Sequence, residues 1–513
     1  MGAERTVGVN VLLTLLVFCI GGCMTGVTLT TDKACMPPQQ ERTDSGLYLI
    51  ATPDMRFKEP DTYFGKERAV ITKRRTHFKL PHPESTALGL ALSGGGIRSN
   101  AFQLGLLSGM HRTDLLKNVD YISAVSGGSW AAGAYKSTLK SDSTFFEELN
   151  AVVTRDDLAT NDSRMHPLFN SYDAAIQQML KVKKDYFYLH VGNSSQEAWR
   201  KMIKINVLNN HDPLIEELNS GNGAVRPYLI FNATHDGKFS FFNSEANNFP
   251  FEITTDYLGS TADCGNTTYC SFYNSNSDIG CFAPTTDKNV PPLFLSHAMA
   301  ISGAVVPQKV FGINLNLMEW IIDLPDAPAG PRCRDHVKLT DGGHAENLGA
   351  LALIERHVPL IIISDAAYDP AQTFGDLTVL QQHADKLLGV ALEKIAEKSA
   401  VRRYRYFSKS TPAESIGTII YLKANSDNNA FEDFLLDANE EWHGMWNGAS
   451  KNGLYNLYTY LETTKQVTDI GFPADKTYAT DYDYRLIFSY YMLGHYFGTK
   501  VLPKEFPRED TGD

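Results

Sequence analysis

The chain has 513 residues, of which 43% are hydrophobic and 21% are charged, as is ordinary for folded domains. This composition excludes a disordered chain, a collagen-like repeat and a polytopic membrane protein. The formal net charge is −12, and no run of Lys and Arg supplies a concentrated basic face. Nucleic acid is therefore not expected as a partner.

The first residues have the pattern of a targeting segment. Residues 7–20 form an apolar run, which suits a signal peptide better than a spanning helix of about 20 apolar residues. The run leads into Ile20-Gly21-Gly22-Cys23, which resembles the lipobox of bacterial lipoproteins. We therefore predict a signal peptide over residues 1–22 and acylation of Cys23. An uncleaved helical anchor and N-myristoylation of Gly2 are the alternatives.

The lipoprotein resemblance also implies a location. It predicts a protein anchored by lipid in the cell envelope. Met24 follows the cysteine, and by analogy with bacterial lipoproteins the lack of Asp at this position favours the outer membrane.

From residue 23 to 85 the chain is polar, and prolines interrupt it, which is typical of a tether and a peripheral lead-in. The composition changes at Ala87, and we expect a folded domain over residues 86–513. Strands at 87–92 and 119–125, each followed at once by a helical pattern, indicate a parallel α/β unit.

Further along the chain the pattern alternates between insertions and core elements. Residues 140–220 and 401–482 lack a clear strand pattern. We interpret them as insertions that form a cap over the functional site of the domain. His235-Asp236-Gly237 predicts the turn of a hairpin. The other expected elements are helices at 293–302, 348–357, 376–398 and 484–498, and strands at 337–340 and 360–364.

A glycine cluster, Gly94-Gly95-Gly96, lies between the first strand and its helix. Glycines allow a sharp turn, and together with a helix N-terminus they can direct several N–H groups toward an anion. The motif lacks the acidic partner of a dinucleotide site and the Lys of a phosphate-binding P-loop. A structural turn is the alternative.

A serine stands between the second strand and its helix, in Ala124-Val125-Ser126-Gly127-Gly128. This placement is typical of a nucleophile elbow, in which the tight turn requires small neighbours. A helix-capping serine is the alternative, but capping alone does not call for two glycines, which weaken a helix.

A third motif, Asp341-Gly342-Gly343, ends the strand predicted at 337–340. An aspartate in this position projects at the edge of a sheet where active sites are built. Taken alone, Asp-Gly-Gly is also a common turn.

Together the three motifs resemble the catalytic core of the patatin-like and cytosolic phospholipase A family. The resemblance covers roughly residues 86–365. It implies a three-layer α/β/α fold with a central, mostly parallel sheet and helical insertions. It also implies a serine lipid acyl hydrolase, acting on membrane lipids without a cofactor or metal ion.

The resemblance also assigns roles to residues. Ser126 is the expected nucleophile, Asp341 its base, and Gly94, Gly95 and Gly96 the oxyanion hole. Arg98 stands where the family places a basic residue that can engage the lipid phosphate. A triad with His344 or His357 as base stays open, although an elbow-type hydrolase places its histidine later, on a loop of its own.

Two other functions share these features. An acyltransferase would use the same residues and pass the acyl group to an alcohol instead of water. A catalytically silent envelope lipoprotein would only bind lipid, but it would have no need for all three motifs.

Overall fold

The structure is a computed structural model that describes the body of the chain. The described residues are 63–81, 86–153, 199–201, 203–236, 248–260, 281–284, 293–304, 307–310, 313–316, 320–323, 336–398, 401–424 and 484–506. Cys23 and the predicted signal peptide lie outside them.

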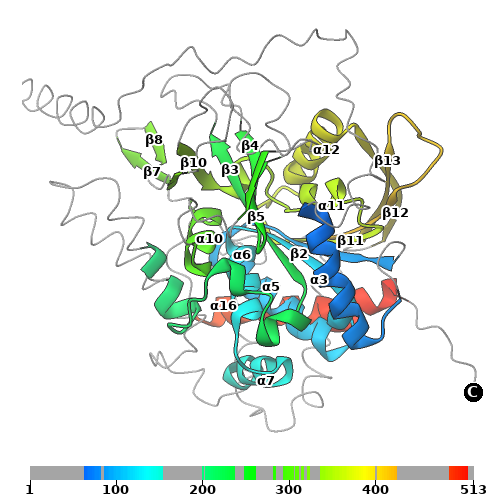
Figure 1. Cartoon of the computed structure of the whole chain (residues 1–513). Helices are drawn as coiled ribbons and strands as arrows, with labels where there is room; N and C mark the ends of the chain where they lie inside the picture. The colour runs from blue at the N-terminus through cyan, green and yellow to red at the C-terminus, as the bar shows by residue number, and fades with distance from the viewer. Residues whose placement is uncertain are drawn as a thin grey trace, which may run out of the picture.

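A twelve-stranded sheet runs through the molecule (Figure 1). Five neighbouring strands at its centre are mutually parallel, in the order β14, β11, β1, β2, β3. Their bounds are β1 (Leu88–Leu92), β2 (Val119–Val125), β3 (Tyr228–Asp236), β11 (Leu360–Asp365) and β14 (Gly417–Lys423). The strands predicted at 87–92, 119–125 and 360–364 are thereby confirmed.

Antiparallel strands extend both ends of this parallel centre. Beyond β14 lie β13 (Val401–Ser408) and β12 (Val390–Lys398). Beyond β3 lie β4 (Asn248–Ile253), β5 (Tyr257–Ser260) and β6 (Cys281–Pro284). β10 (His336–Asp341) also pairs with β3, and β9 (Trp320–Asp323) pairs with β10. A separate hairpin joins β7 (Pro307–Val310) to β8 (Ile313–Asn316).

Helices cover both faces of the sheet, because alternate strand residues point to opposite sides (Figure 1). Leu90 and Phe231 belong to one apolar cluster, together with residues of α5 (Gly96–Arg112), α6 (Gly127–Ser137), α10 (Leu295–Ser302) and α16 (Tyr484–Tyr496). Ala91 and Ile230 belong to a second cluster, with residues of α3 (Tyr63–Phe78), α11 (Leu351–Glu355) and α12 (Gly375–Leu388). The expected three-layer α/β/α fold is confirmed.

The C-terminal helix α16 crosses α5 at very short range. A Cβ at Gly105 would lie 1.8 Å from the Tyr491 carbonyl oxygen, and one at Gly494 would lie 1.9 Å from the Phe102 carbonyl oxygen. Each position therefore tolerates only glycine. The predicted terminal helix is confirmed as part of the helical layer that contains α5.

The predicted tether of residues 23–85 contains helix α3, which is docked on the core. Glu67 accepts hydrogen bonds from the Arg356 guanidinium at 2.8 and 2.9 Å, and both side chains are fully buried. Arg74 and Arg75 pair with the buried Asp120. Breaking a buried pair of this kind costs about 3–5 kcal/mol. Residues 63–78 thus belong to the folded domain.

The prediction of one helix over 376–398 is wrong. Helix α12 ends at Leu388, and Gly389 follows in the left-handed conformation (φ 64°) that commonly terminates helices. The chain then continues as β12, paired with β13. Because β12 is an edge strand with mostly exposed residues, it lacks the alternation of a half-buried strand.

The cap predicted from the two insertions also needs correction. Residues 401–408 and 417–423 form β13 and β14 of the main sheet, and residues 425–483 lie outside the described part of the chain. In the first insertion, α7 (Asp142–Val153) follows the C-terminal end of α6, remote from Ser126 at its start. Helix α7 and strands β13 and β14 therefore do not form the cap, and a cap made by the rest of the two insertions stays a prediction.

The hairpin predicted around His235-Asp236-Gly237 differs as well. β3 continues through Asp236, and its antiparallel partner is β4 at Asn248–Ile253. Residues 238–243, which would form the second strand of such a hairpin, lie outside the described residues. The helical pattern that follows the predicted strand at 119–125 corresponds to α6. The helices predicted at 293–302 and 348–357 correspond to α10 and a shorter α11.

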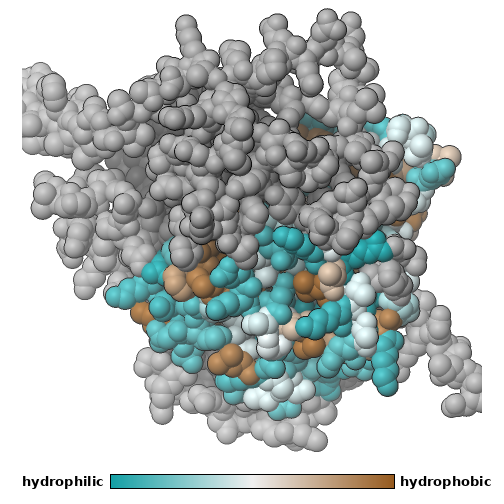
Figure 2. All heavy atoms as spheres, in the orientation of Figure 1, coloured by the Kyte–Doolittle hydropathy of each residue, from teal (hydrophilic) through white to brown (hydrophobic). Residues whose placement is uncertain are grey.

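The described surface is mainly hydrophilic in the view of Figure 2, and its apolar residues form small separate patches. Scattered apolar residues of this kind are normal on a folded protein. In the part of the chain that the structure describes, no helix combines the length and hydrophobicity that a membrane crossing requires.

Candidate active site

Ser126 forms a sharp turn directly between β2 and α6. Its backbone lies at φ 48° and ψ −120°, a conformation that non-glycine residues rarely adopt. A Cβ at Gly127 would lie 2.1 Å from the Gly96 carbonyl oxygen, and one at Gly128 would lie 2.5 Å from that of Leu92. The two glycines therefore let the turn pack against the end of β1 and the loop of residues 94–96, the glycine loop. This is the geometry expected of a nucleophile elbow.

Two buried polar side chains hold this strained turn. The Ser126 N–H donates to the Ser302 hydroxyl at 3.0 Å, and that hydroxyl donates to the Asn232 carbonyl at 2.7 Å. The Asn232 amide in turn donates to the Ser123 hydroxyl and the Ala124 carbonyl. Sequence reasoning missed Ser302 and Asn232.

The glycine loop lies against the elbow. A Cβ at Gly94 would be 3.3 Å from the Ser126 Cβ. The Gly94 N–H donates to the Asn347 carbonyl at 2.9 Å, so it is not available for an oxyanion. Gly95 and Gly96, with φ values of 138° and 63°, supply the N–H groups at the start of α5. These two are the candidate oxyanion donors among the three predicted glycines.

The end of β10 meets the end of β2 on one edge of β3. β4 occupies the other edge along residues 231–236, so β2 and β10 must share the remaining one. Val125 pairs with Asn232, and Asp341 pairs with Ala233, the next residue of β3. Because β2 runs parallel and β10 antiparallel to β3, their carboxyl ends point toward each other. Asp341 is thereby brought beside the elbow.

Contacts within the turn of residues 341–344, the aspartate turn, confirm that it lies beside the elbow and fix the shape of the turn. A Cβ at Gly342 would lie 3.2 Å from the Val125 Cγ1 atom. The buried Asp341 carboxylate accepts the Gly343 N–H at 2.7 Å. The Thr234 hydroxyl donates to the Asp341 carbonyl at 2.7 Å and accepts the Ala345 N–H at 3.0 Å. Thr234 is a further residue that sequence reasoning missed.

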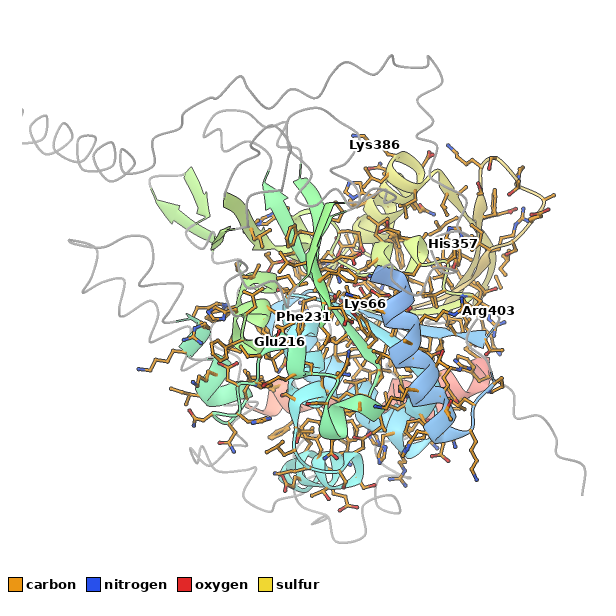
Figure 3. The ribbon with its side chains drawn as sticks, viewed as in Figure 1. Lys66, Glu216, Phe231, His357, Lys386 and Arg403 are labelled. Carbon is orange, nitrogen blue, oxygen red and sulfur yellow. The ribbon has the colours of Figure 1, made fainter. Side chains whose placement is uncertain are left out.

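The two candidate histidines are placed differently. His344 is exposed on the aspartate turn, three residues after Asp341. His357 precedes the amino end of β11, whereas Ser126 follows the carboxyl end of the parallel strand β2. A strand of this length separates the two edges by roughly 17–20 Å. Figure 3 likewise shows His357 well apart from Phe231 of β3, so His357 is not near the elbow.

Glu346 is a buried carboxylate close in sequence to Asp341. It accepts backbone N–H bonds from Leu348, Ala350 and Leu351, where α11 begins. Burial raises the pKa of Glu346 to about 7, although these hydrogen bonds oppose the shift. Its oxygens are committed to the helix start, so its role is to cap α11.

Arg98 is fully buried on the first turn of α5. Its Nε donates to the Ala366 carbonyl at 2.8 Å, in the loop that follows β11. The Ala366 N–H donates to the Ser93 hydroxyl at 2.8 Å, which ties the same loop to the residue preceding the three glycines. The side chain thus braces the glycine loop, and its contact with a lipid phosphate stays a prediction.

A family model described as patatin-like phospholipase matches residues 90–354, more than half of the chain. The chain belongs to the patatin-like phospholipase family. The matched range contains the glycine loop, the elbow and the aspartate turn.

Two human proteins are similar to the chain. Cytosolic phospholipase A2 gamma is 25% identical over 205 residues, which are 38% of this chain and 35% of that protein. The chain thus spans about a third of the length of this curated relative. The solved structure of human GIVD cytosolic phospholipase A2 matches with a TM-score of 0.53 at 10% identity, over 86% of this chain and 66% of that one. This structural match supports the fold alone.

Proposed function

We propose that the protein is a serine lipid acyl hydrolase of the phospholipase A or lysophospholipase type. The observation that carries the proposal is the meeting of the elbow and the aspartate turn on one edge of β3. Membership of the patatin-like phospholipase family supports a lipid ester as the substrate. Ser126 serves as the nucleophile and Asp341 as its base.

The reaction proceeds through an acyl-enzyme. Asp341 takes the proton of the Ser126 hydroxyl as its oxygen attacks the ester carbonyl. The Gly95 and Gly96 N–H groups stabilise the oxyanion, and one such donor is worth about 10²–10³ in rate. The protonated Asp341 then gives its proton to the leaving alcohol. Water attacks the acyl-serine, Asp341 takes its proton, and the fatty acid leaves as Ser126 recovers its hydrogen.

A fluorophosphonate probe tests this proposal. The probe forms a covalent bond with an activated serine, and mass spectrometry of the digested protein should find the label on Ser126. A panel of glycerophospholipids with distinct sn-1 and sn-2 chains then identifies the bond cleaved. A label on another residue would contradict the nucleophile, whereas transfer of the acyl chain to an added alcohol without free fatty acid would indicate the acyltransferase.

Replacing Arg98 tests whether it meets the lipid phosphate. We expect Arg98→Ala to slow the hydrolysis of both phospholipids and uncharged short-chain esters, because the hydrogen bond to the Ala366 carbonyl is lost. The loss should be larger on phospholipids, since the net charge of −12 offers no general attraction for an anionic headgroup. Turnover of both substrates by wild type and variant is the measurement. Equal losses would leave Arg98 with the bracing role alone.

The lipid anchor is proposed on the sequence alone, since Cys23 lies outside the described residues. Signal-peptide cleavage before Cys23, followed by acylation, would place the domain at a lipid surface, and two or more chains anchor stably. We expect Cys23→Ser to prevent acylation and leave an unprocessed precursor. Mass spectrometry of the mature N-terminus decides the matter. An unmodified Met1 or a myristoylated Gly2 would refute the lipoprotein interpretation.

A further inference from the structure

Asn347 lies between the glycine loop and the aspartate turn. Its carbonyl accepts the Gly94 N–H at 2.9 Å. Its side-chain Oδ1 lies 2.2 Å from the point that a Gly94 Cβ would occupy and 2.7 Å from the corresponding point at Gly343. The same two points lie 3.3 Å from the Ser126 Cβ and 3.0 Å from the Asp341 Oδ1. The carboxamide oxygen therefore lies against both the glycine loop and the aspartate turn, close to the two segments that carry the nucleophile and its base.

The other end of this carboxamide is held by Asp376. The Asn347 Nδ2 donates to the Asp376 Oδ2 at 2.7 Å. An ionised carboxylate only accepts hydrogen bonds, so it must face the amide nitrogen. The amide oxygen is then directed toward Gly94 and Gly343.

Asp376 lies at the start of α12, and hydrogen bonds fix the turn that precedes this helix. The Asp369 carboxylate accepts the Thr373 and Phe374 N–H groups at 2.8 and 2.7 Å, which shapes the turn into the helix. The pKa of Asp376 is raised above its ordinary value, chiefly by burial and then by the Asp365 carboxylate, although the hydrogen bond from Asn347 and the Lys423 ammonium oppose the shift. The ionised form of Asp376 thus depends in part on Asn347.

We propose that Asn347 and Asp376 form a positioning pair that sets the glycine loop and the aspartate turn at the separation required for reaction at Ser126. The inference rests on the proposed function, because it assigns the pair to that same site. Asp376 acts through Asn347, and it orients the amide without contact to the lipid. An error of about 1 Å in such a placement can cost 10²-fold in rate.

The test uses the full chain and the rate of fluorophosphonate labelling, with kcat and KM for an uncharged short-chain ester. We expect Asp376→Ala and Asn347→Ala each to lower the labelling rate and kcat by roughly 10- to 100-fold, with KM within about twofold. The double variant should be no slower than the slower single variant, because both changes remove one interaction.

Asp385→Ala is the matched control. Asp385 lies on the same helix and is exposed in an ion pair with Lys409, so the substitution removes the same charge away from Asn347. Labelling should stay within about twofold of wild type. Thermal unfolding checks each variant, and if Asp376→Ala does not fold, Asp376→Ser takes its place, since Ser suits the start of a helix.

The outcomes separate this inference from the proposed function. Labelling of Asp376→Ala at the rate of Asp385→Ala would overturn the pair, and so would losses that multiply in the double variant. A wild-type protein labelled at Ser126 leaves the proposed function intact in both cases. A wild-type protein that is not labelled at Ser126 would overturn the function, and the role of the pair with it.

Discussion

Ser126→Ala should abolish lipid ester hydrolysis and fluorophosphonate labelling. Removing the nucleophile leaves only substrate binding and the oxyanion donors, so we expect activity to fall by about 10⁴-fold or more. Alanine has the same Cβ as serine, so the backbone at φ 48° keeps its strain and its hydrogen bond to Ser302. The melting temperature should therefore stay within a few degrees of wild type.

Ser137→Ala provides the matched control for this variant. Ser137 is the last residue of the same helix, α6, and its hydroxyl donates to the Gly133 carbonyl at 2.9 Å. The Ser137→Ala variant also loses one serine hydroxyl, but at the end of the helix that is remote from the elbow. It should therefore be labelled at the wild-type rate. Full hydrolysis by Ser126→Ala would rule out Ser126 as the nucleophile.

Much of the parallel centre could be predicted from the sequence. Strands buried on both faces appear as continuous apolar runs, and residues 88–92 and 119–125 are such runs. The elbow was visible for a related reason. Two glycines after a serine signal close approach of backbones, and the structure brings Gly127 against Gly96 and Gly128 against Leu92.

The meeting of β2 and β10 could not be predicted from local pattern. It depends on which edge of β3 each strand selects, and Val125 and Asp341 are far apart in the chain. Asn232 and Thr234 did give a weak signal, because polar residues inside an apolar strand need partners when buried. Their partners, Ser302 and the aspartate turn, follow only from the three-dimensional arrangement.

The prediction of one helix over 376–398 was wrong for a different reason. Charged and apolar residues of 390–398 continue the spacing of the preceding helix, so the pattern favours one long helix. A single glycine at 389 and the hydrogen bonds offered by β13 override that preference. An edge strand makes backbone hydrogen bonds to a neighbouring strand on one side only, and it tolerates charged side chains. It therefore lacks the alternation of apolar and polar residues that usually indicates a strand.

The second large effect is expected at the base. Asp341→Asn keeps the shape of the side chain and can still accept the Gly343 N–H, so the turn should hold. A carboxamide cannot take the proton of Ser126, and we therefore expect a loss of hydrolysis comparable to that of Ser126→Ala. Steady-state hydrolysis of a short-chain ester, with thermal unfolding as the check on folding, measures this.

His344→Ala separates the dyad from the triad. His344 follows Asp341 on the same turn but is exposed, whereas Asp341 is buried beside the elbow. If Asp341 itself takes the proton, His344→Ala retains most of the activity and Asp341→Asn loses it. If the histidine is the base, His344→Ala loses activity at least as severely, since an aspartate that only orients an imidazole contributes less than the imidazole does. Activity retained by Asp341→Asn and lost by His344→Ala would reject the dyad.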